Sequence, residues 1–404
     1  MTEFDRVISP SQSSEFRQKF PGVNNKVYFN YGGQGILPRS SLDAILSTYQ
    51  FLEEHGPFSI KANAWIQEKT DLLRQDLAGE LGTTAETLTI TDNVTAGCNI
   101  VLWGLDWQAG DHLLMTDCEH PGVIAIIEAL VDRFGISYST CPIAATLNEG
   151  DPAQVIGEYL TPKTRLVLVS HLLWNTGQVL PLAEIMKVCR QYSGEYPVQV
   201  LVDAAQSAGS LSLNLRELDV DYYAFTGHKW FCGPSGVGGL YVNPRRSPEL
   251  RPTYVGWRGI TYGKQGEMTG WKTDGSRFEI ATSAYPQFEG LRAAIAVHQS
   301  TGNSQERYQK ICQNSVHLWQ GLNQIPQINC LKKTPPEAGL VSFEVKSDFS
   351  HHIWVQSLEK EGFFLRTIAS PNCIRACCHY FTSHEEIDEL LKKIVEKLKK
   401  ATIH

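Results

Sequence analysis

The feature that most constrains the fold is a repeated alternation of short apolar runs with helical patterns. Runs typical of β-strands occupy residues 26–30, 87–91, 111–115, 165–170, 198–203, 222–227 and 238–243, and several precede helical stretches such as residues 181–192. Strands that alternate with helices imply βαβ units, and therefore a mostly parallel sheet with helices on both faces. We therefore predict an α/β fold. Ligands of such sheets bind beyond the carboxyl ends of the strands, so residues just after these runs are the first functional candidates.

The alternation weakens after residue 283, where the pattern becomes α+β. The last helix is predicted to begin with a capping box at Ser383 and Glu386 and to bury one apolar face. Its five lysines are more typical of a solvated helix face than of a nucleic-acid patch. We predict a large domain over residues 24–283 and a small domain over residues 284–404, with residues 1–23 packing on the small domain. The apolar face of the last helix comprises Ile387, Leu390, Leu391, Ile394 and Leu398.

Composition excludes several classes of function. The 404 residues are 42% hydrophobic, which is enough for a large core, and the net charge of −7 argues against binding to nucleic acid or to an acidic membrane surface. No apolar run reaches the ~18 residues that a membrane-spanning helix needs, and the N-terminal residues lack the pattern of a secretory signal. The ten cysteines are scattered and include no CxxC pair, which predicts reduced thiols in the cytoplasm and no metal site.

The strongest motif combines a carboxylate and a lysine at two strand ends. Asp203 ends the run 198–203, Gln206 follows three residues later, and Lys229 lies just past the run 222–227. Either residue alone is usually an ordinary helix cap or a solvated side chain. Together they suit pyridoxal phosphate chemistry, in which lysine forms a Schiff base and a carboxylate keeps the pyridine nitrogen protonated. No phosphate-binding GxxxxGK[ST] or GxGxxG motif follows a strand, so a nucleotide site is not predicted.

Three further candidates follow other strands. Thr95 and the amide of Ala96 open a predicted helix, where they could bind a phosphate or form an ordinary N-cap. His120 could stack on a pyridine ring or be a hydrogen-bonded loop histidine. Asn175 could bind the ring hydroxyl or a substrate carboxylate, or could be a turn residue.

These motifs resemble those of the class V, cysteine-desulfurase-like aminotransferase family of fold type I pyridoxal phosphate enzymes. The resemblance runs from KVYFNYGGQG at residue 26 to the C-terminal helix. It implies a large domain with a mostly parallel seven-stranded sheet, a smaller α+β C-terminal domain, and a homodimer in which Thr282 reaches the phosphate site of the other subunit. It also implies these roles: Lys229 as the catalytic Schiff-base lysine, Asp203 at the pyridine nitrogen, Gln206 at O3′, His120 stacked on the ring, and Thr95, Thr226 and His228 at the phosphate.

Two arginines are predicted to bind the substrate carboxylate. A planar guanidinium suits a carboxylate, and Arg366 and Arg375 both follow predicted strands in the small domain. Arg375 matches the family's carboxylate-binding arginine, and Arg366 matches the arginine that opens the preceding loop. Trp257, with Arg258 beside it, is a candidate for the outer part of the substrate pocket.

One departure from the family pattern bears on the reaction. Cysteine desulfurases carry a nucleophilic cysteine on a mobile loop between these two arginines, whereas only eight residues, TIASPNCI, separate them here. Cys373 falls beside the second arginine, where we expect a buried thiol. The chain is then most similar to the cyanobacterial-type L-cysteine/L-cystine C–S lyases, which implies β-elimination to pyruvate and ammonia. Cystine is the expected better substrate because a persulfide should leave more readily than hydrosulfide, and the persulfide could supply sulfur to an iron–sulfur apoprotein.

Three alternatives stay open at this point. A desulfurase using another thiol, such as Cys373, would release alanine. A transaminase or a kynureninase-like hydrolase on the same scaffold would yield little pyruvate from cystine and would act on other amino acids. A relic without activity that binds sulfur-transfer partners would have no need of Lys229, Asp203 and His120 together.

Overall fold

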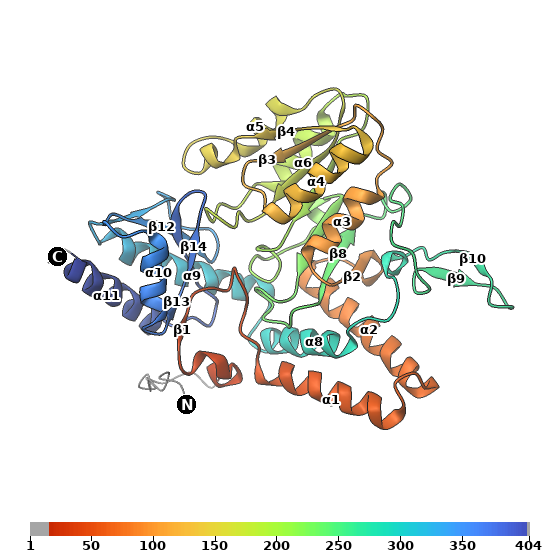
Figure 1. Cartoon of the computed structure of the whole chain (residues 1–404), viewed down its shortest axis with the longest axis horizontal. Coiled ribbons are helices and arrows are strands. Elements are labelled where there is room, and N and C mark those ends of the chain that lie inside the picture. The colour runs from red at the N-terminus through yellow and green to blue at the C-terminus, as the bar shows by residue number, and fades with distance from the viewer. Residues whose placement is uncertain (1–15, 402–404) are drawn as a thin grey trace.

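A seven-stranded sheet forms the centre of the molecule. In the computed structural model (Figure 1), which describes residues 16–401, the strand order is β2-β8-β7-β6-β5-β3-β4. β8 is antiparallel to both of its neighbours, and every other pair is parallel. The predicted mostly parallel α/β sheet is thus confirmed. Its strands are β2 (Leu88–Thr91), β3 (His112–Thr116), β4 (Ser137–Cys141), β5 (Thr164–Ser170), β6 (Gln199–Asp203), β7 (Tyr222–Thr226) and β8 (Gly238–Val242).

Two details of the strand prediction were wrong. The edge strand β4 was missed because its sequence, SYSTC, is polar and only its last residue is buried. The run 26–30 does form a strand, β1 (Val27–Tyr28), but it pairs in parallel with β13 (Phe363–Phe364) of the C-terminal region. Val27 and Phe29 are buried in the hydrophobic core of that region, and this packing explains why the segment does not join the large sheet.

Helices cover both faces of the large sheet because its central strands are apolar on both sides. In β5, Leu166 and Leu168 pack with α3 and α4, whereas Val167 and Val169 point to the core shared with α2, α6 and α8. α1 packs along α8 on the outside (Figure 1). The helices are α1 (Arg39–His55), α2 (Ile60–Leu81), α3 (Val94–Gly104), α4 (Pro121–Phe134), α5 (Pro152–Tyr159), α6 (Leu182–Gln191), α7 (Leu215–Leu218) and α8 (Tyr285–Gln299).

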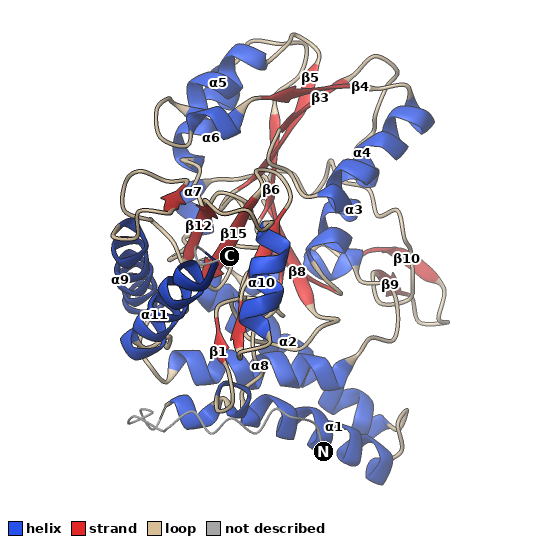
Figure 2. Cartoon of the chain, turned by 60° about the vertical axis from the view of Figure 1, so that its left-hand side comes forward, coloured by secondary structure: helices blue, strands red, loops and turns tan. Residues whose placement is uncertain are grey.

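The C-terminal region is a four-stranded antiparallel sheet with order β11-β12-β15-β14. Figure 2 shows α9, α10 and α11 beside it, and the apolar side chains of these helices complete its core. The elements are α9 (Ser304–Asn323), β11 (Ile328–Cys330), β12 (Leu340–Val345), α10 (His351–Glu359), β14 (Arg366–Ile368), β15 (Cys373–Cys377) and α11 (His384–Ala401).

The predicted start of the last helix is confirmed. The backbone N–H of Ser383 donates to the Glu386 carboxylate at 2.9 Å, and the N–H of Glu386 donates to the Ser383 hydroxyl at 3.2 Å. Four of the five predicted apolar residues of α11 are buried, and Leu391 is half-buried against the same core. Arg17 pairs with Glu386 at 2.6 Å, and Phe20 stacks on Phe381, so residues 16–23 contact the C-terminal region; residues 1–15 lie outside the described part of the chain.

The division at residues 283 and 284 stays a prediction. Although α8 follows that boundary, it packs against α1 and α2 beside the large sheet.

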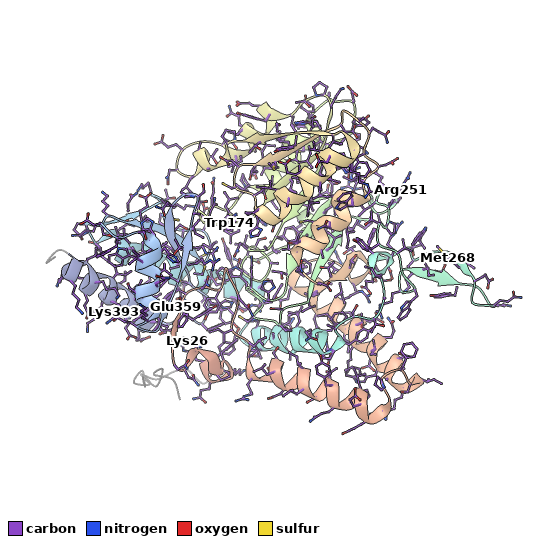
Figure 3. The ribbon with its side chains drawn as sticks, in the orientation of Figure 1. Lys26, Trp174, Arg251, Met268, Glu359 and Lys393 are labelled. Atoms are coloured by element: carbon purple, nitrogen blue, oxygen red, sulfur yellow. The ribbon has the colours of Figure 1, made fainter. Side chains whose placement is uncertain are left out.

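A hairpin of β9 (Ile260–Tyr262) and β10 (Met268–Trp271) projects from the body of the molecule, with Met268 near its tip (Figures 1 and 3). Within residues 16–401, none of the helices combines the length and the apolar character needed to cross a membrane.

Candidate active site

A cavity of about 720 Å³ lies where the carboxyl ends of the large sheet meet β14 and β15. The loops after five strands of the large sheet contribute to its wall. Eight of the predicted site residues line it together: Thr95, His120, Asp203, Gln206, His228, Lys229, Arg366 and Arg375.

Asp203 is the last residue of β6, and it is only 5% exposed. Its Oδ1 accepts a hydrogen bond of 2.9 Å from the backbone N–H of Ala205. Burial raises the pKa of Asp203, and the nearby Lys229 and His120 oppose that rise. A buried carboxylate in this position would be stabilised by a cationic group bound in the cavity.

Lys229 follows β7 and lines the cavity together with His228. Burial lowers the pKa of Lys229 to about 8, with Arg375 adding to the effect and Asp203 opposing it. A larger fraction of the amine than in an ordinary lysine is therefore neutral near pH 7, and a neutral amine can act as nucleophile or base. The loop after β1 braces these two residues, because the N–H of Gly35 donates to the His228 carbonyl at 2.7 Å and any side chain at Gly35 would overlap the Lys229 carbonyl.

His120 caps the N-terminus of α4 with its ring. Its Nδ1 accepts a hydrogen bond of 3.1 Å from the backbone N–H of Gly122, which leaves the hydrogen of the neutral ring on Nε2. Burial and the proximity of Lys229 lower the pKa of His120, so this neutral form is favoured. The ring meets the edge of Trp174 at a centroid distance of 5.7 Å. His120 is thus a flat, uncharged ring held in a fixed direction at the cavity wall.

The amide of Gln206 also has one orientation. Its Oε1 accepts a hydrogen bond of 3.0 Å from the indole N–H of Trp230, and its Nε2 donates to the Gly32 carbonyl at 2.8 Å. Because an amide nitrogen carries two hydrogens, the second hydrogen of Nε2 remains for a ligand in the cavity.

The two arginines lie opposite each other on neighbouring strands, since Arg366 of β14 pairs with Arg375 of β15. Arg375 is 3% exposed and donates to the Trp174 carbonyl at 2.8 Å and to Asn30 Oδ1 at 3.4 Å. Its Nε has no partner within the described residues. Arg366 is exposed at the mouth. Buried arginine donors without an acceptor indicate an anionic ligand such as a carboxylate.

Two residues that were predicted to bind the phosphate, Ala96 and Thr226, do not line the cavity. The N–H of Ala96 is already used by the helix cap, because it donates to Asn93 Oδ1 at 3.0 Å. The Thr226 hydroxyl is buried and lies 2.6 Å from Nδ1 of His228. Thr226 thus contacts His228, which does line the cavity, and its own role at the phosphate stays a prediction. Burial lowers the pKa of His228 to about 4.

Three other predicted residues also lie outside the cavity lining. The Asn175 amide is buried and donates to the Ser370 carbonyl at 3.2 Å, so it links the loop after β5 to the β14–β15 turn. Thr282 and Trp257 line a separate groove between the N-terminal helices and the loops around residues 257 and 284. Arg258, next to Trp257, is buried against Glu279 and Tyr285.

Sequence reasoning missed several residues of the cavity wall. The loop after β1 supplies Asn30 and residues 32–34, and the loop after β5 supplies Ser170 and Trp174. Ser170 ends a predicted strand, which was a usable signal. Asn30 ends another predicted run and two glycines follow it, and they reach the cavity because β1 joins the C-terminal region. In Figure 3, Trp174 lies between the C-terminal region and the upper part of the large sheet.

No cysteine lines this cavity. Nine of the ten thiols are buried, and the half-buried tenth, Cys312, lies on α9. Burial raises the pKa of Cys373 to about 12, so a negligible fraction of it is thiolate at neutral pH. The β14–β15 connection is a short turn. Within the described residues, no group of three His, Cys, Asp or Glu side chains could hold a metal ion.

Comparison with known proteins places this geometry in a family. Residues 27–390 match the family model for aminotransferase class V. The chain belongs to this family. The resemblance found in the sequence is therefore confirmed.

Two solved structures of a protein named C-DES are 62% identical to this chain, with TM-scores of 0.92 and 0.91, and cover 93% of it and 98% of their own chain. One is a mutant with glycine covalently linked to its pyridoxal phosphate cofactor; the other is a complex of this cystine C–S lyase with its product, cysteine persulfide. A cysteine desulfurase of Escherichia coli (strain SE11) is 29% identical and covers 93% of this chain and 95% of its own. Isopenicillin N epimerase of Streptomyces clavuligerus is 32% identical over 57% of each chain.

Proposed function

We propose that this protein is a pyridoxal phosphate-dependent C–S lyase that cleaves L-cystine, and L-cysteine less well, by β-elimination. The observation that carries the proposal is a cavity that combines Lys229, Asp203 and two arginines but no thiol. The likeness to a cystine C–S lyase over nearly the whole chain supports it.

The residues of the cavity fit the cofactor. Asp203 offers a buried carboxylate for the pyridine nitrogen, Gln206 a spare amide hydrogen for the ring hydroxyl, and His120 a flat neutral ring to stack on the pyridine. Thr95, at the positive end of the eleven-residue helix α3, suits the phosphate together with His228. When bound, pyridoxal phosphate supplies an electron sink that makes the α-hydrogen of an amino acid acidic.

Three residues of the cavity, Arg366, Arg375 and Lys229, are assigned to substrate binding and proton transfer. Arg375 and Arg366 bind its carboxylate, and the contact of Arg375 with the Trp174 carbonyl fixes the direction of the guanidinium. With the cofactor bound, the amine of Lys229 would accept the α-proton of the substrate at Nζ, a role that suits a buried lysine whose pKa is lowered to about 8. The bond from the β-carbon to sulfur then breaks, and the electron pair leaves with sulfur. For cystine, one water is consumed, and the products are pyruvate, ammonia and cysteine persulfide.

Product analysis tests this proposal. Purified holoenzyme is mixed with L-cystine, and pyruvate, ammonia, alanine and persulfide sulfur are quantified. Equimolar pyruvate and ammonia with persulfide and no alanine are expected. Alanine as the main product would overturn the lyase in favour of a desulfurase, and little pyruvate with turnover of other amino acids would favour a transaminase or a hydrolase.

We further propose a homodimer in which Thr282 completes the phosphate site of the partner subunit. Thr282 lies in a groove away from Lys229, and large apolar side chains around that groove are exposed. A second copy would cover them. Sedimentation analysis should give twice the 45.1 kDa of one chain, and Tyr49→Glu should shift the chain toward the monomer. These exposed side chains include Tyr49, Phe58, Tyr254, Val255, Trp257 and Ile280.

The released persulfide suggests an acceptor. A persulfide carries sulfur that a thiolate can take up directly, so we propose an iron–sulfur apoprotein as the recipient. The ten free cysteines fit a reducing, cytoplasmic setting. Transfer of labelled sulfur from cystine to such an apoprotein, with and without this enzyme, tests this step.

A further inference from the structure

A second buried carboxyl group lies behind the cavity wall. Glu119 is 4% exposed and precedes His120. Its Oε1 accepts hydrogen bonds from the Thr116 hydroxyl at 2.7 Å and from the backbone N–H of Ser170 at 2.9 Å. Its Oε2 lies 2.8 Å from the Ser170 hydroxyl oxygen. Ser170 lines the cavity and pairs with Asp203 across β5 and β6, so Glu119 contacts a residue beside the proposed partner of the pyridine nitrogen.

Glu119 has no cationic partner among the ion pairs of the described residues. The titratable groups that face it are the carboxylate of Asp203 and the thiols of Cys98, Cys118 and Cys141. Burial, with a contribution from Asp203, raises the pKa of Glu119 to about 8. Asp203, in contrast, has Lys229 and His120 nearby. Of the two carboxyl groups, Glu119 is therefore the one that keeps its proton at neutral pH.

We propose that Glu119 is a positioning residue whose proton sets the direction of the Ser170 hydroxyl. When Glu119 is protonated, its Oε2–H donates to the Ser170 oxygen, and the Ser170 hydrogen turns to the cavity. When Glu119 is ionised, it can only accept, so Ser170 donates to Glu119 and presents a lone pair to the cavity. The same 2.8 Å contact thus makes Ser170 a donor in one state and an acceptor in the other.

This inference rests on the proposed function, because the Ser170 hydroxyl affects chemistry only if a cofactor lies beside Asp203. A donor at Ser170 favours the ionised form of Asp203, which a protonated pyridine requires. Ionisation of Glu119 removes that donor and adds a second negative charge nearby. The bound cofactor should therefore change its protonation above pH 8.

The titration of Glu119 itself can be measured without cofactor or substrate. In the apoprotein, infrared difference spectra should show a protonated carboxyl band that disappears as the pH rises through about 8 and that is absent from Glu119→Gln. Ser170→Ala should keep the band. A parent protein without such a band at pH 7 overturns the proposal, whether or not the variant folds.

Denaturant unfolding gives a second measurement. The folded pKa of Glu119 lies above the ordinary value of 4.5, so the parent binds the proton more tightly when folded and loses stability as the pH rises from 4.5 to about 8. Glu119→Gln has no such proton, so the ratio of the two folding constants should shift by up to about tenfold per pH unit in favour of the variant. Parallel pH profiles overturn the proposal.

In the holoenzyme, the visible absorbance of the cofactor should titrate near pH 8 in the parent. This change should be lost in Glu119→Gln and reduced in Ser170→Ala, where only the charge of Glu119 still acts on Asp203. If Ser170→Ala retains the whole change, the Ser170 hydroxyl is not the link and the proposal fails. If the parent holoenzyme does not cleave cystine, the proposed function is overturned instead, and the infrared and unfolding results still stand.

Discussion

The two halves of the cavity are built differently. The half that suits the cofactor consists of residues at or directly beyond the ends of strands in the large sheet, such as Asp203 at the end of β6 and Lys229 after β7. The half that suits the substrate carboxylate consists of two residues within antiparallel strands, Arg366 and Arg375, together with Asn30 from the loop after β1. The first half depends on the topology of one parallel sheet. The second depends on strand register and on the joining of distant segments.

This difference predicts different sensitivities. Groups at parallel strand ends are held by buried backbone, so their replacement removes chemistry and leaves the fold in place. Arg375 is held by contacts with the Trp174 carbonyl and Asn30, which come from two other segments, so its replacement changes substrate affinity and the contact between the two halves together.

The largest effect is expected in the first half. Lys229→Ala should lower kcat for pyruvate formation from cystine by at least about 10³-fold, because one substitution removes both the proposed nucleophile and the proposed base. Pyruvate release under saturating cystine measures it, and circular dichroism checks the fold. Lys264→Ala, on the exposed hairpin loop, is the control and should be unchanged. Retention of more than a tenth of kcat by Lys229→Ala would refute the assignment.

A smaller effect, mainly on KM, is expected in the second half. Arg375→Lys keeps the charge but loses the planar fork, which should raise KM for cystine about 10- to 100-fold. Arg366→Lys should raise it less, because Arg366 is exposed and solvent screens its charge. Initial rates over a range of cystine concentrations separate KM from kcat. Equal effects of the two substitutions would mean that burial does not distinguish the arginines.

The same contrast explains how much of the site could be predicted from sequence. Asp203, Gln206 and Lys229 follow recognisable strands, and parallel strands bring their carboxyl ends to one edge, so these residues could be brought together without a structure. The carboxylate-binding role of Arg366 and Arg375 was predicted from the guanidinium chemistry, the predicted strands and the family resemblance. Their pairing across β14 and β15 was not predicted, since a register between short antiparallel strands leaves no clear signal in the sequence.

Residues held by long-range packing were not predictable. Asn30 reaches the cavity because β1 pairs with β13, more than 300 residues later, and Trp174 matters through its main-chain carbonyl, whose role its side chain does not reveal. The edge strand β4 was missed for a related reason, because with a neighbour on only one side it needs little apolar sequence. Asn175 was placed after the right strand, but its amide turns to Ser370 and so away from the cavity lining.

The contact between the segment after Lys229 and the C-terminal region can be tested by measuring the stability of the protein at low pH. His298 is buried on α8, and its ring bridges the Phe231 carbonyl, two residues after Lys229, and the Tyr380 hydroxyl of the C-terminal region at 2.8 and 2.7 Å. Burial lowers the pKa of His298 to about 4, below its ordinary 6.5. The unfolded chain therefore binds the proton more tightly, and stability is lost as the pH falls from 6.5 through about 4.

Replacing His298 removes its share of this acid sensitivity. The folding constant of His298→Gln, measured by denaturant unfolding, should be lower than that of the parent at pH 7, and the gap should narrow by up to about tenfold per pH unit toward pH 4. The exposed His352 on α10 is the matched control, and His352→Gln should follow the parent at every pH. A constant gap between His298→Gln and the parent would mean that His298 does not titrate at this junction.

The smallest effect is expected at Cys373, and it addresses the reaction itself. Cys373 lies two residues before Arg375 in β15, so it belongs to the substrate half by position, yet it is buried and burial raises its pKa to about 12. Cys373→Ala should change the rate of pyruvate formation from cystine by less than about twofold, since so little thiolate is present. Cys312→Ala, at the half-buried thiol on α9, is the control. A loss of turnover in Cys373→Ala alone, with alanine among the products of the parent, would make the second half of the cavity the site of a nucleophile and would reverse the comparison between the two halves.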